Sequence, residues 1–372
     1  MAMKALRLTY LCLETPREGQ AVFTHVHEII GGLRHLGWQV DLVTAEGGGS
    51  STGRSLVSRL AGYAGAYGKM LARLWSSDAI YIRAHPAAYP IAALARMLGR
   101  PVFQELNGKP TDLVVTYPAL RPFATVVSWA YRTQLAKADH VFTVTDGLRD
   151  WIVTGTPQRN VTIIPNGANT NVFTPGGARA DLGHRYVIFA GGVTAWHGIG
   201  TMIAALAEPD WPADVRLLVV GDGVERGLLE KQSHNPKLKW LGRQPYRDLP
   251  ALIRGAIAAL CIIENPEDRS AMGVAPIKLY EAMACGVPVI VSKLPFQAEL
   301  ISSLGAGLVV PMANPAALAS AVASLASSAE ISELMGARGA DYVRRSASWQ
   351  ARAADTSHVM SKVLGRSARV KR

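Results

Sequence analysis

Lys278 and Glu281 are the residues whose types and spacing most directly suggest chemistry. They lie in GVAPIKLYEAMACGVPVI at residues 273–290, where Pro276 suits a first helical turn and the cation and carboxylate, three residues apart, share one face. A surface ion pair contributing about 0.2–0.5 kcal/mol would explain them. Three small residues before the helix instead favour a ligand at its N-terminus: Gly273, Val274 and Ala275. A cation there suits a diphosphate, and a carboxylate can accept hydrogen bonds from ribose hydroxyls.

Two glycine-rich turns precede this stretch, each after an apolar run. In YVIFAGGVTAWHGIGTMIAAL, Gly191 and Gly192 would let backbone N–H groups approach an anion, and a helix beginning near Gly198 would direct its positive end to the same place. Such turns are also common packing devices. In VVGDGVERGLLE, Gly221 and Gly223 lack the full dinucleotide-binding fingerprint, so we expect them to form a wall of a nucleotide pocket.

Polar residues follow apolar runs in the first half of the chain as well. Glu105 and Asn107, in FQELNG, are two residues apart at an expected strand end and should point to the same side. Arg83 and His85, which follow the apolar run AIYI, are expected to line the same rim, although Arg83 could instead simply pair with an acidic residue. Gly19 and Gln20 lie in the loop after the first apolar run.

The elements that position these residues follow an alternating pattern. Short β-branched runs alternate twice with helical stretches, as expected for parallel βα units, and the polar segment NVFTPGGARADLGHR separates the two series. We therefore predict an α/β protein with two Rossmann-like domains, 1–173 and 174–348, facing each other across a cleft. A C-terminal helix or tail, 349–372, is expected to pack back on the first domain. Open parallel sheets bind ligands beyond the carboxyl ends of their strands.

Composition excludes several classes of protein. Of the 372 residues 49% are apolar and 18% charged, which excludes a disordered chain. The three cysteines lack paired spacing, so free thiols in a reducing compartment are expected. No apolar run reaches the ~18 residues of a membrane helix, and the first apolar run is shorter than a signal-peptide core. We expect a cytoplasmic protein.

The net charge of +11 is local: +6 in residues 1–173, +5 in residues 362–372 and zero between them. Residues 48–77 contain no acid, and four basic residues flank an apolar stripe of helical spacing there: Arg54, Arg59, Lys69 and Arg73. Two interpretations remain open. The segment is either a core-packed helix with a solvated basic face, or a helix lying on an anionic membrane surface. No recognition motif favours nucleic acid.

GVAPIKLYEAMACGVPVIVS resembles the donor-site signature of retaining glycosyltransferases of family 4, which have the two-domain GT-B fold. Other segments resemble the same family: EGQAVFTHVHEIIGGLRHLGWQVDLVT its Gly-loop and first helix, ADHVFTVTDGLRDWIVTG and VTIIPNGANTNVFTP its domain junction, and FAGGVTAWHGIGTMIAAL its phosphate turn. The resemblance implies a second domain that binds a nucleotide-diphospho-sugar, with Glu281 holding the ribose. It also implies hexosyl transfer with retention, in which the leaving diphosphate helps to deprotonate the acceptor. Gly19 and Gln20 would then approach the donor phosphate and the acceptor.

The sequence departs from the family pattern at several positions. Gly273 replaces the usual Glu eight residues before the ribose carboxylate, Gly192 and His197 replace the usual Arg and Lys, and Asn107 replaces a frequent His. The combination of WHG and PIK resembles a branch of the family. We predict that Lys278, assisted by His197, supplies the missing charge without a metal or cofactor, since there is no Asp-Xaa-Asp motif.

The sequence says less about the substrates than about the class of reaction. The segment LGRQPYRD at 241–248, which includes Arg243, is expected to edge the base pocket. A lipid-linked glycan in polysaccharide assembly, at the inner face of a membrane, is the preferred acceptor, and a soluble small molecule is the alternative. A nucleotide-sugar epimerase and a non-catalytic nucleotide-sugar-binding protein on the same fold are the remaining alternatives.

Overall fold

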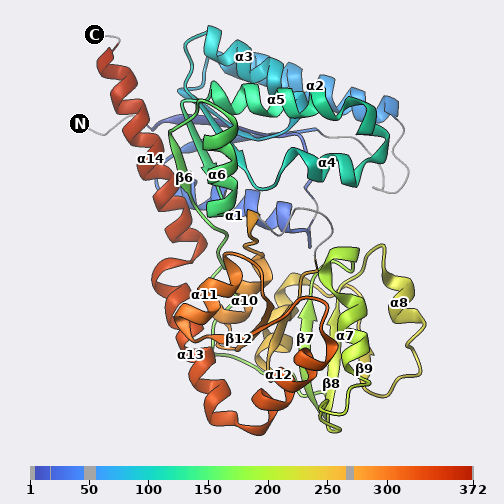
Figure 1. The fold of residues 1–372 in the computed structure, drawn as a ribbon. Coiled ribbons are helices and arrows are strands. Elements are labelled where there is room, and N and C mark those ends of the chain that lie inside the picture. Colours follow the sequence, from blue (N-terminus) through green and yellow to red (C-terminus); the bar gives the residue numbers. More distant parts are fainter. Residues whose placement is uncertain (1–4, 17, 46–55, 265–271, 371–372) are drawn as a thin grey trace. The chain divides into compact units, whose positions relative to one another are not determined.

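The computed structural model of the chain describes residues 5–16, 18–45, 56–264 and 272–370. The chain divides into two compact units, one comprising Met1–Pro165 with Arg352–Arg372 and the other Asn166–Ala351 (Figure 1). The boundaries expected from the sequence lie instead at 173 and 348. The segment after Pro165 therefore belongs to the second unit. Helix α14 (Trp349–Val370) contributes its residues from Arg352 onward to the first unit.

The first unit contains a parallel sheet with strand order β2-β1-β3-β4-β5-β6. Its strands are β1 (Arg7–Cys12), β2 (Gln39–Thr44), β3 (Ala79–Arg83), β4 (Val102–Leu106), β5 (His140–Thr143) and β6 (Val161–Ile163). The helices between them are α1 (Ala21–His35), α2 (Leu56–Leu74), α3 (Tyr89–Met97), α4 (Pro110–Thr116), α5 (Ala124–Ala136) and α6 (Asp146–Gly155), with two 3-10 helices, η1 (Pro86–Ala88) and η2 (Pro118–Phe123).

Helix α2 contains the basic segment singled out in the sequence. Ala66, Met70 and Leu74 from its apolar stripe are buried against the sheet, together with residues of α3. Near the end of the helix, Nε of Arg73 lies 3.7 Å from Oδ2 of Asp41, on β2. Part of the stripe therefore packs on the core of the unit, as in the first of the two interpretations, while Leu60 and Leu71 remain exposed. Arg54 and the side chain of Arg59 lie outside the described residues.

The second unit contains another parallel sheet, with strand order β12-β11-β10-β7-β8-β9. Its strands are β7 (Arg185–Ala190), β8 (Val215–Val220), β9 (Leu238–Trp240), β10 (Ala259–Cys261), β11 (Val289–Ser292) and β12 (Gly307–Val310). The helices are α7 (Ile199–Ala205), α8 (Arg226–Glu230), α9 (Leu249–Arg254), α10 (Ile277–Ala284), α11 (Gln297–Leu304), α12 (Pro315–Ser327) and α13 (Ala329–Ser346), with two 3-10 helices, η3 (Ala195–His197) and η4 (Tyr246–Asp248). The last strand expected from the sequence is the run GVPVIVS, which forms β11, so edge strand β12 was not expected.

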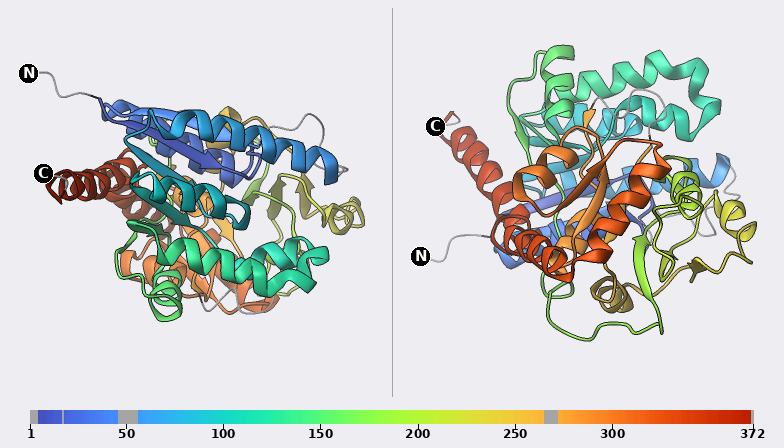
Figure 2. Two further views of the ribbon diagram at one scale, coloured as in Figure 1. Left: turned by 90° about the horizontal axis from the view of Figure 1, so that it is seen from above. Right: turned by 60° about the horizontal axis from the view of Figure 1, so that its bottom comes forward.

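Each sheet has one point where the strand order reverses. In the first unit this point lies between β1 and β3, and in the second it lies between β7 and β10. Helices cover both faces of each sheet (Figures 1 and 2). Ligands of such sheets bind beyond the carboxyl ends of the strands at the reversal. The fold therefore directs attention to the residues that follow β7 and β10 and to those that follow β1 and β3. None of the described helices combines the length and apolarity needed to cross a bilayer.

Candidate functional site

Lys278 lies at the reversal point of the second sheet. Its ammonium is 4.0 Å from the centre of the Phe189 ring, on β7, and a Cβ added to Gly191 would lie 3.2 Å from the same nitrogen. Nζ is buried and has no hydrogen-bond partner among the described residues. Burial lowers the pKa of Lys278 to about 8. A buried cation without an acceptor costs free energy, which an anionic ligand at this position would offset.

Glu281 is also buried, but it forms no ion pair with Lys278 among the described residues. Its Oε1 accepts a hydrogen bond of 3.1 Å from the hydroxyl of Tyr246, in η4. The Tyr246 ring packs edge-on against Phe173, at 5.2 Å between centroids. The explanation of Lys278 and Glu281 as an ion pair on a surface helix is therefore wrong. Tyr246 is a residue that the sequence analysis placed near the base pocket without giving it this role.

The N-terminus of α10 is open. Pro276 is the N-cap rather than the first helical residue, and no side-chain cap is formed among the described residues. The carbonyl of Ala275 accepts a 2.6 Å hydrogen bond from Nδ2 of Asn166, in the PNG segment of the second unit. This bond fixes the chain just before the helix. Asn166 was not among the predicted site residues, because nothing in its sequence position indicates a contact with residue 275.

The segment before α10 is held by an unusual turn. Gly273 has φ 72°, and Phe296, the residue before α11, has φ 69° and ψ −65°. The amide of Gln297 donates to the carbonyl of Pro295 at 3.0 Å, which closes a strained three-residue turn at Phe296. Val274 forms an isolated bridge with Phe296. Two residues with left-handed backbone thus set the path of the chain into the helix.

The first glycine turn, Gly191 and Gly192, leaves fewer backbone amides available to bind an anion than the sequence suggested. The amide of Gly191 donates to Val220 at 2.9 Å, so it is used within the fold, whereas the amide of Gly192 has no partner among the described residues. Nδ1 of His197 lies 2.5 Å from the Gly192 carbonyl and 2.9 Å from Oγ1 of Thr194. Because a carbonyl only accepts, Nδ1 carries the proton, and Nε2 is the acceptor of the neutral ring.

The second glycine turn packs against the first. A Cβ on Gly221 would lie 1.9 Å from the Gly191 carbonyl oxygen, and one on Gly223 would lie 2.1 Å from the Val193 carbonyl oxygen. Close backbone approach therefore explains both glycines. Arg243, after β9, is exposed and has no hydrogen-bond or ion-pair partner among the described residues.

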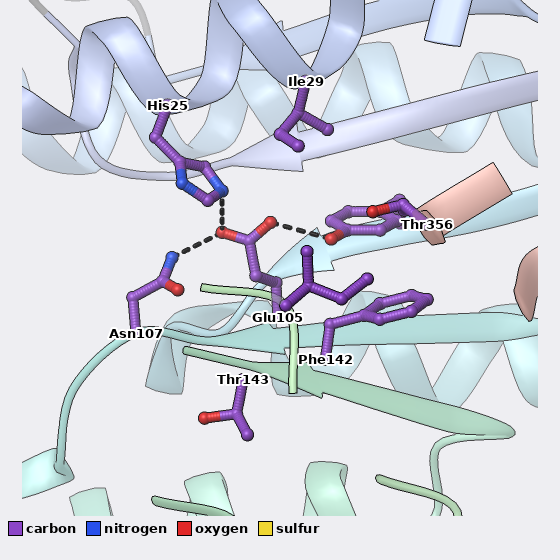
Figure 3. A pocket seen from close by; sticks show the side chains of 9 residues that line it. His25, Ile29, Glu105, Asn107, Phe142, Thr143 and Thr356 are labelled. Carbon is purple, nitrogen blue, oxygen red and sulfur yellow. Dashed lines mark hydrogen bonds and ion pairs between the residues drawn. The ribbon is translucent and has the colours of Figure 1, made fainter. Parts of the chain in front are cut away.

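The first unit holds a buried carboxylate at the carboxyl end of β4 (Figure 3). Oε1 of Glu105 lies 2.7 Å from Nη1 of Arg83, 2.9 Å from Nε2 of His25 and 2.5 Å from Nδ2 of Asn107. Oε2 accepts from Tyr81 at 2.7 Å and from Tyr10 at 3.2 Å. Glu105 and Asn107 thus do point to the same side of the strand.

The partners of Glu105 keep it ionised. Burial acts to raise the pKa of Glu105, but the His25 ring, the Arg83 guanidinium and the Tyr81 hydroxyl outweigh it and hold the pKa below its usual range. A carboxylate with so many donors is a poor proton acceptor. Its chemical use is to position Arg83, His25 and Asn107.

The residues around the Glu105 carboxylate differ in whether their polar atoms are already used in contacts within the first unit. Arg83 also binds Oε1 of Glu14, at 3.0 Å, so the expectation that it pairs with an acid is confirmed twice over. Oδ1 of Asn107 is buried without a hydrogen-bond partner among the described residues. Nδ1 of His85 accepts from the amide of Ala87 at 3.2 Å, and burial lowers the pKa of His85 to about 4, so this ring is neutral.

The loop after β1 is the most open part of the predicted site. Gly19 has φ 83°, with no atom within 4 Å of an added Cβ, and Gln20 is exposed. Gln20 precedes α1 but provides no side-chain cap. Among the described residues, no side chain caps the first turn of α1.

Comparisons with known proteins agree with this arrangement. Residues 177–341 match the model of glycosyl transferases group 1, and residues 22–172 match that of glycosyltransferase family 4. D-inositol 3-phosphate glycosyltransferase of Segniliparus rotundus is 29% identical over 213 residues, which are 53% of this chain and 45% of that protein. The chain spans about half the length of the curated relatives it matches.

Solved structures share the fold along nearly the whole chain. Sucrose-phosphate synthase from Thermosynechococcus elongatus has a TM-score of 0.78 at 18% identity, covering 97% of this chain and 100% of that one. Anabaena HepE in complex with UDP-glucose has a TM-score of 0.70 at 14% identity, covering 96% and 100%. With its two parallel six-stranded sheets and both family models matched, the chain belongs to the glycosyltransferases of the group 1 and family 4 type, with the GT-B fold.

Proposed function

We propose that the protein transfers a sugar from a nucleotide-diphospho-sugar to an acceptor hydroxyl, with retention of configuration and without a metal. The observation that carries this proposal is the buried ammonium of Lys278. It lies at the reversal point of the second sheet and has no acceptor among the described residues. Few anions other than a phosphate group combine enough charge and acceptor atoms to compensate such a group.

Donor binding is assigned to the second unit. Lys278 and the open N-terminus of α10 receive the diphosphate, and Glu281, held by Tyr246, accepts hydrogen bonds from the ribose. The UDP-glucose complex of Anabaena HepE, which shares the fold, supports a donor of this class. Gly191, Gly192, Gly221, Gly223 and Arg243 line the remaining donor pocket in this proposal.

Catalysis in this proposal is mainly electrostatic. Charge grows on the diphosphate as the glycosidic bond breaks, and the Lys278 ammonium stabilises it; His197 assists once its Nε2 takes up a proton and can donate to the diphosphate. The departing diphosphate takes the proton of the acceptor hydroxyl, so Glu105 need not act as a base. Glu105 instead positions Asn107 and Arg83, which orient the acceptor together with His85, Gly19 and Gln20.

The acceptor is proposed to be a lipid-linked glycan. A soluble acceptor is the second candidate, and the name of the Segniliparus rotundus relative, D-inositol 3-phosphate glycosyltransferase, favours it. Transfer assays with a lipid-linked glycan and with inositol phosphates, run in parallel, separate the two acceptor classes.

The test of the reaction compares Lys278→Ala with Lys293→Ala, which removes an exposed lysine of the same unit. Titration calorimetry with nucleoside diphosphates measures binding, and donor consumption with and without acceptor measures turnover. We expect Lys278→Ala to lower kcat/KM by more than about 10-fold and Lys293→Ala to leave it unchanged. Unchanged turnover in Lys278→Ala would contradict the mechanism. Donor isomerisation without acceptor would indicate an epimerase, and binding without turnover a non-catalytic protein.

A further inference from the structure

Helix α5 carries a row of large apolar side chains on its outer face. Phe123, the last residue of η2, and Val126 and Trp129 on α5 follow one another at intervals of three residues, so they line one side of the helix. Their exposed fractions are 58%, 59% and 53%. The opposite side of α5 is buried, through Val127 and Leu135 among others. The helix is therefore apolar on both sides, although the core needs only one.

The segment that carries this row is basic. Residues 113–138 contain no aspartate or glutamate, and their charged residues are Arg121, Arg132 and Lys137, all exposed. Arg121 has no side-chain partner among the described residues. Arg132 donates to the Gly155 carbonyl at 3.0 Å and lies over the Trp151 ring. The apolar row and its flanking charges define a face, called here the α5 face.

The α5 face differs from the basic helix singled out in the sequence. Helix α2 buries Met70 and Leu74 of its apolar stripe in the core, although Leu60 and Leu71 are exposed. On α5, whose place in the first unit is shown in Figure 1, all three side chains of the row are more than half exposed. Contiguous exposed aromatic and aliphatic side chains mark interaction sites more often than ordinary surface.

We infer that the α5 face docks on a bilayer that contains anionic lipid. Phe and Trp side chains insert at the boundary of headgroups and acyl chains, and Arg121 and Lys137 pair with lipid phosphates at the same level. A segment without carboxylates suits a negatively charged surface. The inference rests on the proposed function only for the acceptor: docking would bring the first unit to a lipid-linked acceptor.

The experiment measures sedimentation of the full chain with vesicles of phosphatidylglycerol and phosphatidylcholine, and with phosphatidylcholine alone. The wild type is expected to bind the anionic vesicles at low salt and to release them as salt rises. Phe123→Ser combined with Trp129→Ser should weaken binding at least tenfold. Arg121→Gln should weaken it about fivefold, as expected for one basic residue near the surface. Val126→Ser, which preserves the contact of Trp129 with Tyr89, should act in the same direction.

Two matched controls locate the contact. Leu334→Ser changes a side chain of similar exposure, 53%, on α13, and should leave vesicle binding unchanged. Trp75→Ser changes a 64% exposed residue just after α2 and should also have no effect. Circular dichroism confirms that each variant is folded.

Several outcomes would overturn the inference. They are absence of binding at low salt, full binding by the Phe123→Ser, Trp129→Ser variant, and an equal loss in Trp75→Ser. Lipid-free self-association of the wild type that this variant abolishes would instead make the face an interface between copies. The vesicles contain no nucleotide sugar, so a failure here leaves donor binding by calorimetry untouched. A failure of donor binding likewise leaves the vesicle result standing.

Discussion

At the scale of single residues, the Lys278 ammonium of the second unit is buried where its positive charge lowers the stability of the fold. The Lys278 side chain lies among apolar residues at the ends of β7 and β10, with the Phe189 ring below it. The ring face stabilises the ammonium only in part, because a cation–π contact contributes about 2 kcal/mol when desolvated. A residue that costs stability in the free protein is typical of a binding site.

Replacing Lys278 by methionine should therefore stabilise the protein while weakening donor binding. Burial lowers the pKa of Lys278 from its ordinary value of 10.5 to about 8. The folded protein then binds this proton less tightly than the unfolded chain, so below about pH 8 the charged lysine costs up to about 3 kcal/mol. That cost disappears as the pH rises from about 8 towards 10. The advantage of Lys278→Met in urea unfolding should be largest at pH 7 and vanish near pH 10.

The same titration should appear in ligand binding. Affinity of the wild type for a nucleoside diphosphate should fall as the pH rises through about 8, because the ammonium loses its charge. The affinity of Lys278→Met should be lower and should lack this step. A wild type that is less stable than the variant at pH 10 as well, or a variant with undiminished affinity, would contradict the assignment.

At the scale of elements, the path of the chain into α10 depends on Gly273 and Phe296. Repeated apolar runs and their glycine turns are sufficient to predict most strands and the helix after Pro276. The strained turn at Phe296 is not predictable, because a phenylalanine with positive φ contradicts its own local preference and is held by contacts distant in sequence. The bond between Asn166 and Ala275 escapes prediction for the same reason.

Gly273→Ala should disturb the path of the chain into α10. The residue has φ 72°, and its new Cβ would lie 3.1 Å from both the Pro295 carbonyl oxygen and the Phe296 Cβ, so strain and crowding add. We expect a loss of about 1–2 kcal/mol in unfolding free energy and a raised KM for the donor. Gly31→Ala, within α1 and with no atom near the added Cβ, should instead gain up to about 1 kcal/mol and leave KM unchanged. Thermal unfolding and donor kinetics measure both variants, and equal effects would refute the role of Gly273.

At the scale of the whole molecule, periodicity predicts two βα series and two parallel sheets. Strand β12 was missed because GLVV is short and lies next to a helical pattern, so its assignment depends on pairing with β11. The cluster formed by Glu105, Arg83, His25 and Asn107 was predicted only in part. The spacing of Glu105 and Asn107 indicates a shared direction, but the contact with His25 joins α1 to β4 and has no local signal. Outward-facing Trp129 is likewise a property of packing rather than of sequence.

Each unit has its own sheet and its own polar centre, so we expect calorimetric unfolding in two transitions that respond to different changes. Glu105→Gln leaves Arg83 without its buried counter-charge and should cost the first unit about 3–5 kcal/mol. A nucleoside diphosphate at about 100 times its Kd should stabilise the second unit by about 2.7 kcal/mol, and Lys278→Ala should reduce that gain. The Glu105 carboxylate contributes above its ordinary pKa and loses its contribution as the pH falls, so the difference between Glu105→Gln and wild type should shrink in acid. A single transition that shifts with both changes would show that the two units unfold together. If the nucleoside diphosphate instead stabilised the transition that Glu105→Gln lowers, the donor would bind to the first unit, contrary to the assignment.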